Sequence, residues 1–277
     1  MTRQTYATDI TDSEWRYLEP YLPAPKSGGR PRRHAVREIL NAIFSVLRSG
    51  CAWRLLPHDL PPWKTVYHYF RLWRVQGLWP ALHNILHTVV RRQAGRDPNP
   101  SAAILDSQSV KTTMVGGPRG YDGGKKVNGR KRHLLVDTQG LIIHAVVHPA
   151  DIADREGAKL LLAPLQGRIP RLRHIWADSA YSGKAREWVE STLGCTLEIV
   201  KHWWTGLRWV WVGPGQEPPT IPSRFHVLPR RWVVERTFAW LVTYRRLSKD
   251  YEALPDTSEA LIYLAMSRLM VKRLAHA

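Results

Sequence analysis

The segment KRHLLVDTQGLIIHAVV (131–147) decides the fold, because it holds two apolar runs separated by four turn residues. Runs of this length, rich in Val, Ile and Leu, are typical of strands, and the residues between them are of the kind that join a β-hairpin. We therefore expect two antiparallel strands at 131–137 and 141–147. The run AAILDS (102–107) predicts a third strand upstream, which would complete a three-stranded meander.

Downstream of this hairpin the pattern alternates between helix and strand. Helical periodicity at 154–165 and 183–193 is interleaved with the apolar runs RHIWAD (173–178) and CTLEIV (195–200). Strands separated by helices of this length pair in parallel. The order predicts an α/β, ribonuclease H-like domain, with a mixed five-stranded sheet flanked by helices.

The first part of the chain is helical instead. Apolar residues recur at helical spacing in four segments, 11–22, 35–49, 62–75 and 79–92. The sequence RDPNPS (96–101) breaks this pattern. We therefore expect an all-α domain over residues 1–98 and the α/β domain over residues 99–277, with a Trp-rich insertion at about 201–228.

Three acidic residues lie in apolar surroundings. Asp106 and Asp178 end apolar runs on strands that would be neighbours in the sheet, and Glu235 lies in a predicted helix over 230–245. A carboxylate after a buried strand needs a partner. Asp and Glu supply the hard oxygen ligands that Mg²⁺ prefers, and paired ions about 3.5–4 Å apart assist phosphodiester cleavage. The alternative for each acid is a surface or capping role, and Asp178 could cap the helix that follows it.

The chain is strongly basic, with 41 Lys and Arg against 23 Asp and Glu and a formal net charge of +18. The excess runs through both halves rather than a tail. A positive field of this kind favours phosphate partners and salt-dependent binding, although solubility alone is the alternative. We expect a nucleic acid partner.

Two groups of basic residues are candidates for that contact. A dense block precedes the strand at 131–137 and consists of Lys125, Lys126, Arg130, Lys131 and Arg132. We interpret it as a loop that grips phosphates, and the alternative is a solvated charged loop. Arg30 and Arg32 lie in a Gly-Arg-Pro-Arg sequence that resembles a minor-groove AT-hook, or else in an ordinary linker.

The helical segments offer a second kind of DNA contact. The helices at 35–49 and 62–75 could form a helix-turn-helix. The later helix would then present four side chains, those of Lys64, His68, Arg71 and Arg74. His83 and His87 lie four residues apart on the next helix, but no third ligand is evident, so we expect them on its surface.

Cysteine and hydropathy patterns indicate the compartment. Cys51 and Cys195 lie far apart, which argues against a disulfide framework and a thiolate zinc site. The first residues form no apolar signal segment, and no run approaches about 18 apolar residues. We expect a cytoplasmic protein.

Four blocks of sequence, in this order, resemble the DDE transposases of bacterial insertion sequences. They are ILDSQSVK, GGKKVNGRKRHLLVDTQG, ADSAYSG and RRWVVERTFAWL, and the resemblance extends to TDSEW and CAWRLLP near the N-terminus. It implies that Asp106, Asp178 and Glu235 form a catalytic triad that binds two Mg²⁺ ions, with Mn²⁺ able to substitute. It also implies DNA cleavage and strand transfer at the ends of an insertion sequence. The implied partners are the terminal inverted repeats, the target DNA and a second copy of the chain, in a nucleoid-associated protein.

Related transposases often carry Tyr-x2-Arg-x3-Glu-x6-Lys around the catalytic Glu. Arg231 and Glu235 match this pattern, whereas Leu228 and Val242 stand at the Tyr and Lys positions. Arg231 either contacts a phosphate or forms a salt bridge with Glu235 one turn away. Two weaker readings of the whole chain are a metal nuclease that cuts without joining and a catalytically inert DNA-binding regulator.

Overall fold

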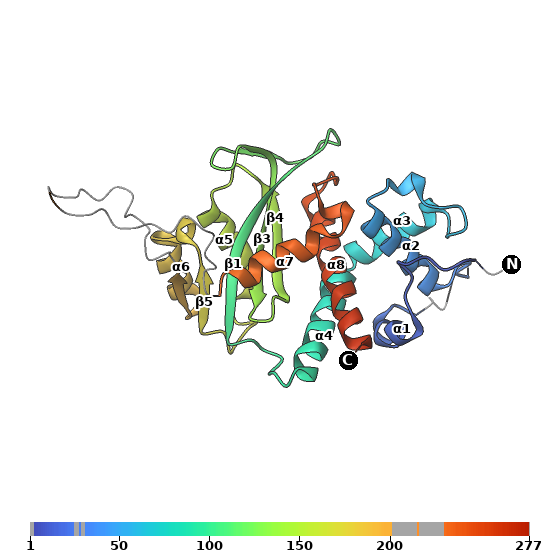
Figure 1. Cartoon of the computed structure of the whole chain (residues 1–277), viewed down its shortest axis with the longest axis horizontal. Helices are drawn as coiled ribbons and strands as arrows, with labels where there is room; N and C mark the ends of the chain where they lie inside the picture. Colours follow the sequence, from blue (N-terminus) through green and yellow to red (C-terminus); the bar gives the residue numbers. More distant parts are fainter. Residues whose placement is uncertain (1–2, 25–27, 29–30, 201–214, 216–229, 277) are drawn as a thin grey trace.

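The computed structural model describes residues 3–24, 28, 31–200, 215 and 230–276 (Figure 1). Arg30 and, apart from Gly215, the predicted Trp-rich insertion lie outside the described residues. No helix within these ranges is long and apolar enough to cross a membrane. Cys51 and Cys195 are both free thiols.

The N-terminal part is helical, as predicted. It contains α1 (Asp12–Leu18), η1 (Glu19–Tyr21), α2 (Val36–Ser49), η2 (Trp53–Leu55), α3 (Trp63–Val75) and α4 (Leu78–Gln93). The first helix begins with a capping box, in which Thr11 accepts from the Glu14 N–H and the Glu14 carboxylate accepts from the Thr11 N–H. Gly50 ends α2 with φ of 73°, a conformation that glycine adopts without strain.

The exposure of side chains agrees with the prediction on α3 and differs from it on α4. Lys64, His68 and Arg71 are exposed on α3, which a DNA-reading helix requires. The prediction of surface histidines on α4 is wrong, because His83 and His87 are both buried. The His87 Nε2 atom lies 3.3 Å from the carboxylate of the buried Asp137, so this histidine ties α4 to the sheet.

The sheet has six strands: β1 (Ala102–Lys111), β2 (Gly120–Asp122), β3 (Val127–Asp137), β4 (Ile142–Pro149), β5 (His174–Ala177) and β6 (Thr196–Ile199). β3 pairs antiparallel with β1 and β4, and β1, β5 and β6 pair in parallel. This confirms the five predicted strands in ribonuclease H-like order. The sixth, β2, forms a hairpin with β3 inside the segment that we expected to be a loop.

Helices cover both faces of the sheet (Figure 1). One face packs against α5 (Asp154–Leu162), η3 (Ala163–Leu165) and α6 (Lys184–Leu193), and the other against α7 (Trp232–Val242) and α8 (Pro255–Ala275). Two short turns, η4 (Ser179–Tyr181) and η6 (Arg245–Leu247), follow β5 and α7. Alternate residues of β1 serve the two faces, since Leu105 belongs to the α5–α6 core and Ile104 to the α7–α8 core.

The α7–α8 core continues without a break into the N-terminal helices. α8 packs against α1, α4 and β4, and is buried on most sides along its length. Leu254 is the N-cap of α8 and makes no side-chain bond, while Glu259 accepts from the Val147 N–H in β4 at 2.8 Å. The domain boundary near residue 98 stays a prediction.

Candidate active site

Asp106 lies on β1 and points to the face that α7 covers. It has the same strand parity as Ile104, whose side chain belongs to the α7–α8 core. Its side chain is 14% exposed. Burial raises the pKa of the Asp106 carboxyl to about 6, although the Ser107 N–H, which donates at 2.7 Å, favours the charged form. Asp106 is therefore a carboxylate that gains from a nearby cation.

Asp178 follows the last residue of β5. Ile104 of β1 pairs with Trp176 of β5, so the parallel register carries Asp178 to the level of Asp106. One oxygen of Asp178 accepts from the Ala180 N–H at 2.9 Å and caps η4, as the alternative reading expected. The other oxygen faces Arg231 at 4.0 Å. The residue thus holds the end of the strand and also takes part in a charge cluster.

Arg231 brings the three acids together. Its Nη2 atom lies 3.7 Å from Asp106, 4.0 Å from Asp178 and 3.7 Å from Glu235. Glu235 is one helical turn further on, in the first turn of α7, and its side chain is 48% exposed. The i,i+4 salt bridge that we considered is present, and the same guanidinium also reaches two acids on the sheet. Three elements far apart in sequence therefore converge on one cation.

Comparisons with known proteins identify the family of the chain. Residues 10–83 match the family model "Putative transposase of IS4/5 family", and residues 97–201 and 175–272 match two models described as "Transposase DDE domain". A 16.2 kDa protein of insertion element IS402 from Burkholderia cepacia is 32% identical over 117 residues, covering 39% of this chain and 76% of that protein. The chain belongs to the DDE transposases of bacterial insertion sequences.

Two further similarities were found. The uncharacterized protein y4sN of Sinorhizobium fredii is 25% identical to this transposase over 117 residues, covering 42% of this chain and 87% of that protein. A solved structure titled "Mos1 transposase paired-end complex with left transposon end" aligns with 14% identity and a TM-score of 0.23. That alignment covers 63% of this chain and 61% of the other.

The three acids of the transposase supply oxygen donors of the type that a divalent metal ion binds. Within the described ranges, no three His, Cys, Asp or Glu side chains lie close enough together to hold a metal ion. Arg231 gives the physical reason, since its guanidinium lies between the carboxylates. The donors are all hard oxygens gathered around a cation, which is the setting that Mg²⁺ requires. A metal would take the place of the guanidinium, so Arg231 has to move for the ion to bind.

The basic block splits into two groups. Lys125 and Lys126 are exposed, and the Lys125 ammonium donates to the Ser107 carbonyl at 3.2 Å, next to Asp106. Arg130, Lys131 and Arg132 are instead buried, with 0%, 5% and 1% of their surfaces exposed. They could contact phosphate only by leaving their partners inside the protein.

Those internal partners are carbonyls and carboxylates distant in sequence. Arg130 donates to the carbonyls of Glu252 and Ala253 and to Asp250, and Arg132 donates to the Leu247 and Lys249 carbonyls. These two arginines therefore fasten β3 to the segment between α7 and α8. Arg32, the described member of the AT-hook pair, lies with its guanidinium 5.4 Å from the Tyr69 ring on α3.

Sequence reasoning missed a polar network behind Asp106. Ser107 donates to Asp154 at 2.9 Å, and the Lys131 ammonium lies 3.3 Å from the same carboxylate. His133 and His148 share a hydrogen bond of 2.9 Å next to this network. The signal was the two-residue alternation of β3, which places Lys131 and His133 on the α5 face and Arg132 on the other.

Proposed function

We propose that this transposase cleaves DNA at the ends of its insertion sequence and joins those ends to target DNA in a reaction that depends on Mg²⁺. Asp106, Asp178 and Glu235 would hold the metal ions, with Asp106 central because it is the most buried of the three. The observation that supports this is the single cation shared by the three carboxylates, at 3.7–4.0 Å.

The bound ions would supply charge stabilisation and an activated nucleophile. In the first step water attacks phosphorus at the element end, and the bond to the 3′ oxygen breaks to release a 3′-hydroxyl. In the second step that hydroxyl attacks a target phosphodiester, so one P–O bond forms as another breaks. No group of the protein becomes covalently attached to DNA in either step.

Residues around the triad would orient the DNA. Lys125 and Lys126 are exposed, and Lys125 contacts the residue next to Asp106, so these two lysines are the proposed phosphate contacts of the basic block. Arg231, displaced from the acids by metal, is close enough to turn toward a phosphate of the cleaved strand. The exposed Lys64, His68 and Arg71 on α3 would contact the terminal repeat. Pairing of two element ends requires two copies, so we propose a homodimer on DNA.

The test is cleavage and joining of a labelled duplex that carries the element end, in Mg²⁺ or in EDTA. Asp106→Asn removes the central charge with little change of shape, and we expect it to abolish both products. Asp97→Asn is the matched control, because Asp97 is a carboxylate on the surface, 46% exposed and paired with Arg171.

Each outcome separates one reading from the others. A joined product that needs Mg²⁺, disappears in Asp106→Asn and persists in Asp97→Asn supports the proposal. Cleavage without joining would favour a nuclease. Tight binding of the duplex with no product in any metal would favour an inert regulator, and activity retained by Asp106→Asn would exclude this triad.

A further inference from the structure

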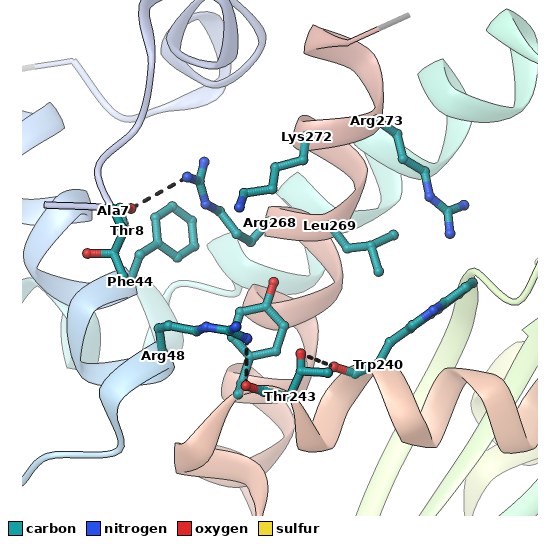
Figure 2. A pocket seen from close by; sticks show the side chains of 11 residues that line it. Ala7, Thr8, Phe44, Arg48, Trp240, Thr243, Arg268, Leu269, Lys272 and Arg273 are labelled. Carbon is teal, nitrogen blue, oxygen red and sulfur yellow. Dashed lines mark hydrogen bonds between the residues drawn. The ribbon is translucent and has the colours of Figure 1, made fainter.

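A pocket of about 460 Å³ opens between α2, α7 and α8, away from the acidic triad (Figure 2). Its volume lies in the range of about 300–1,000 Å³ that is usual for ligand sites. Figure 2 shows Arg48 reaching from α2 toward the backbone of Thr243, and Arg273 pointing from α8 toward Trp240. α2, from the N-terminal part, and the successive helices α7 and α8 therefore line one pocket.

The charge of this pocket has one sign. Its lining includes four cations, Arg48, Arg268, Lys272 and Arg273, and no Asp or Glu. Arg268 is neutralised from behind by the buried Glu14, at 2.6 Å. Arg48 donates to the Thr243 carbonyl. Within the part of the chain that the structure describes, Lys272 and Arg273 take part in no ion pair.

Several positively charged side chains lie close together in and beside the pocket. Arg268 and Lys272 are four residues apart on α8, and Glu14 offsets the charge of Arg268 alone. The guanidiniums of Arg236 and Arg273 lie 4.6 and 4.7 Å from the centre of the same Trp240 ring. Burial, and then the charge of Arg236, lower the pKa of Arg273. An anion in the pocket would relieve this repulsion.

The alternative is a purely structural role, in which Lys272 and Arg273 only offset the negative C-terminal end of the α8 dipole. Cations in the last turn of a helix do this. That explanation leaves out Arg48, which comes from another helix and lines the same pocket. It also leaves out Trp240 and Tyr244, whose rings lie under the guanidiniums of Arg273 and Arg48. Rings used in this way orient the cations rather than offer free faces to a base, so the chemistry fits a phosphate group.

The pocket adjoins α7, the helix that carries Glu235, on the side away from the triad. Trp240 is five residues beyond Glu235 on α7, which is about 7.5 Å along the helix axis. On its other side, Arg48 and Phe44 come from α2, the first helix of the predicted helix-turn-helix. The pocket therefore adjoins both α2 and the helix that carries Glu235.

We propose that the α2–α7–α8 pocket binds the sugar-phosphate backbone of DNA between the end-recognition helices and the catalytic acids. Lys272 and Arg273 make the phosphate contacts, Arg48 closes the pocket from α2, and Trp240 holds Arg273 in place. The inference rests on the proposed action on DNA and adds a binding site about one and a half helical turns from Glu235.

The experiment measures binding of the labelled element-end duplex to the full chain in EDTA, over a series of salt concentrations. The pocket variant Lys272→Gln/Arg273→Gln removes two cations, and the control Lys159→Gln/Arg186→Gln removes two from α5 and α6. For the pocket variant we expect affinity to fall about tenfold or more and the slope of log K against log salt to shrink by about 1–2. For the control we expect a slope within error of wild type.

A thermal unfolding curve identifies a variant that fails to fold, and the exposed Lys272→Gln alone then serves in its place, with an expected slope change of about 1. Wild-type affinity and slope in the pocket variant would overturn the inference, as would an equal loss in the control. Because binding is measured without metal, the two proposals fail separately. If the wild-type protein binds the duplex but does not cleave it in Mg²⁺, only the proposed catalysis is contradicted. If the wild-type protein cleaves the duplex and the pocket variant binds it as tightly as wild type, only the pocket proposal is contradicted.

Discussion

Arg231 is the residue that connects the three acids of the candidate active site. Its Nη2 atom lies 3.7–4.0 Å from all three acids, and its Nε atom is buried without a hydrogen-bond partner in the described structure. Without this guanidinium, three carboxylates would face one another, and at least one would protonate or separate. In the proposed mechanism, Arg231 would stabilise the metal-free site and compete with the metal for it.

Replacing Arg231 with Gln should uncouple these two roles. Loss of the competing cation should tighten Mn²⁺ or Mg²⁺ binding by about tenfold, a free-energy change of about 1.4 kcal/mol. Without metal, repulsion between the acids should destabilise the variant. Titration calorimetry with Mn²⁺ measures the first effect and thermal unfolding in EDTA the second. Unchanged metal affinity, judged against Arg186→Gln, would contradict the competition.

Charge density in the sequence did not distinguish binding cations from structural ones. Arg130 and Arg132 look like neighbours of Lys125 and Lys126, yet their partners lie between residues 247 and 253, which no local pattern reveals. Asp106 and Asp178 were easier to single out, because each carboxylate comes at the end of an apolar strand. Arg231 was predicted at its position, but local spacing could show only its contact with Glu235.

The two kinds of cation should respond differently to mutation. Arg130→Gln leaves buried acceptors unpaired and should cost about 3 kcal/mol or more of folding free energy. Lys125→Gln/Lys126→Gln should leave stability unchanged and reduce the salt slope of DNA binding by about 1–2. Denaturant unfolding and salt-dependent binding separate the two. A stable Arg130→Gln protein with weakened DNA binding would restore this arginine to the phosphate contacts.

At the scale of elements, apolar runs and turn residues predicted five strands and seven helices to within a few residues. β2 escaped prediction because Gly120–Asp122 has no apolar run, and its pairing with β3 comes from the partner strand. The helix of Glu235 is shorter than its periodicity suggests, ending at Val242 rather than near 245. Pairing with a neighbouring strand, rather than local propensity, decided β2.

Glu259 shows what tertiary structure adds to a helix terminus. It lies in the first turns of α8, and burial raises its pKa to about 7 from an ordinary 4.5. At Glu259 the folded state therefore binds more protons than the unfolded state between these values, so the contribution of this group to stability is greatest below pH 4.5 and falls as the pH rises to about 7.

Replacing Glu259 with Gln should remove this loss. The amide oxygen can still accept from the Val147 N–H, and no charge has to be buried. Above pH 7 the variant should be more stable than wild type by up to about 3 kcal/mol, with little difference near pH 4. Unfolding by urea across this pH range measures the difference, and Asp256→Asn, an exposed acid in the same turn, should show almost none. A constant difference at every pH would show that the charge of Glu259 is not the cause.

At the scale of the molecule, the helical and catalytic parts share one interior. The core that contains Ile39 and Phe70 of the N-terminal helices also contains Leu134 and Phe238 of the catalytic part. α8, at the end of the chain, packs against α1 near its beginning. Separate folding of residues 1–98 and 99–277 would leave this apolar surface open to water, which is costly. The helical part and the α/β part are thus packed around one shared core.

A single buried ion pair allows a test of whether the two parts unfold together. Arg268 of α8 donates to Glu14 of α1 at 2.6 Å, and both side chains are at most 5% exposed. Glu14→Gln keeps a residue that suits the capping box but leaves the arginine charge unpaired, which should cost about 3 kcal/mol. Asp12→Asn, two residues away and 91% exposed, should cost less than about 1 kcal/mol. Calorimetry should show one transition, shifted as a whole by Glu14→Gln, because the pair connects the first helix to the last. Two transitions, of which only one moves, would mean that the parts unfold independently despite their shared core.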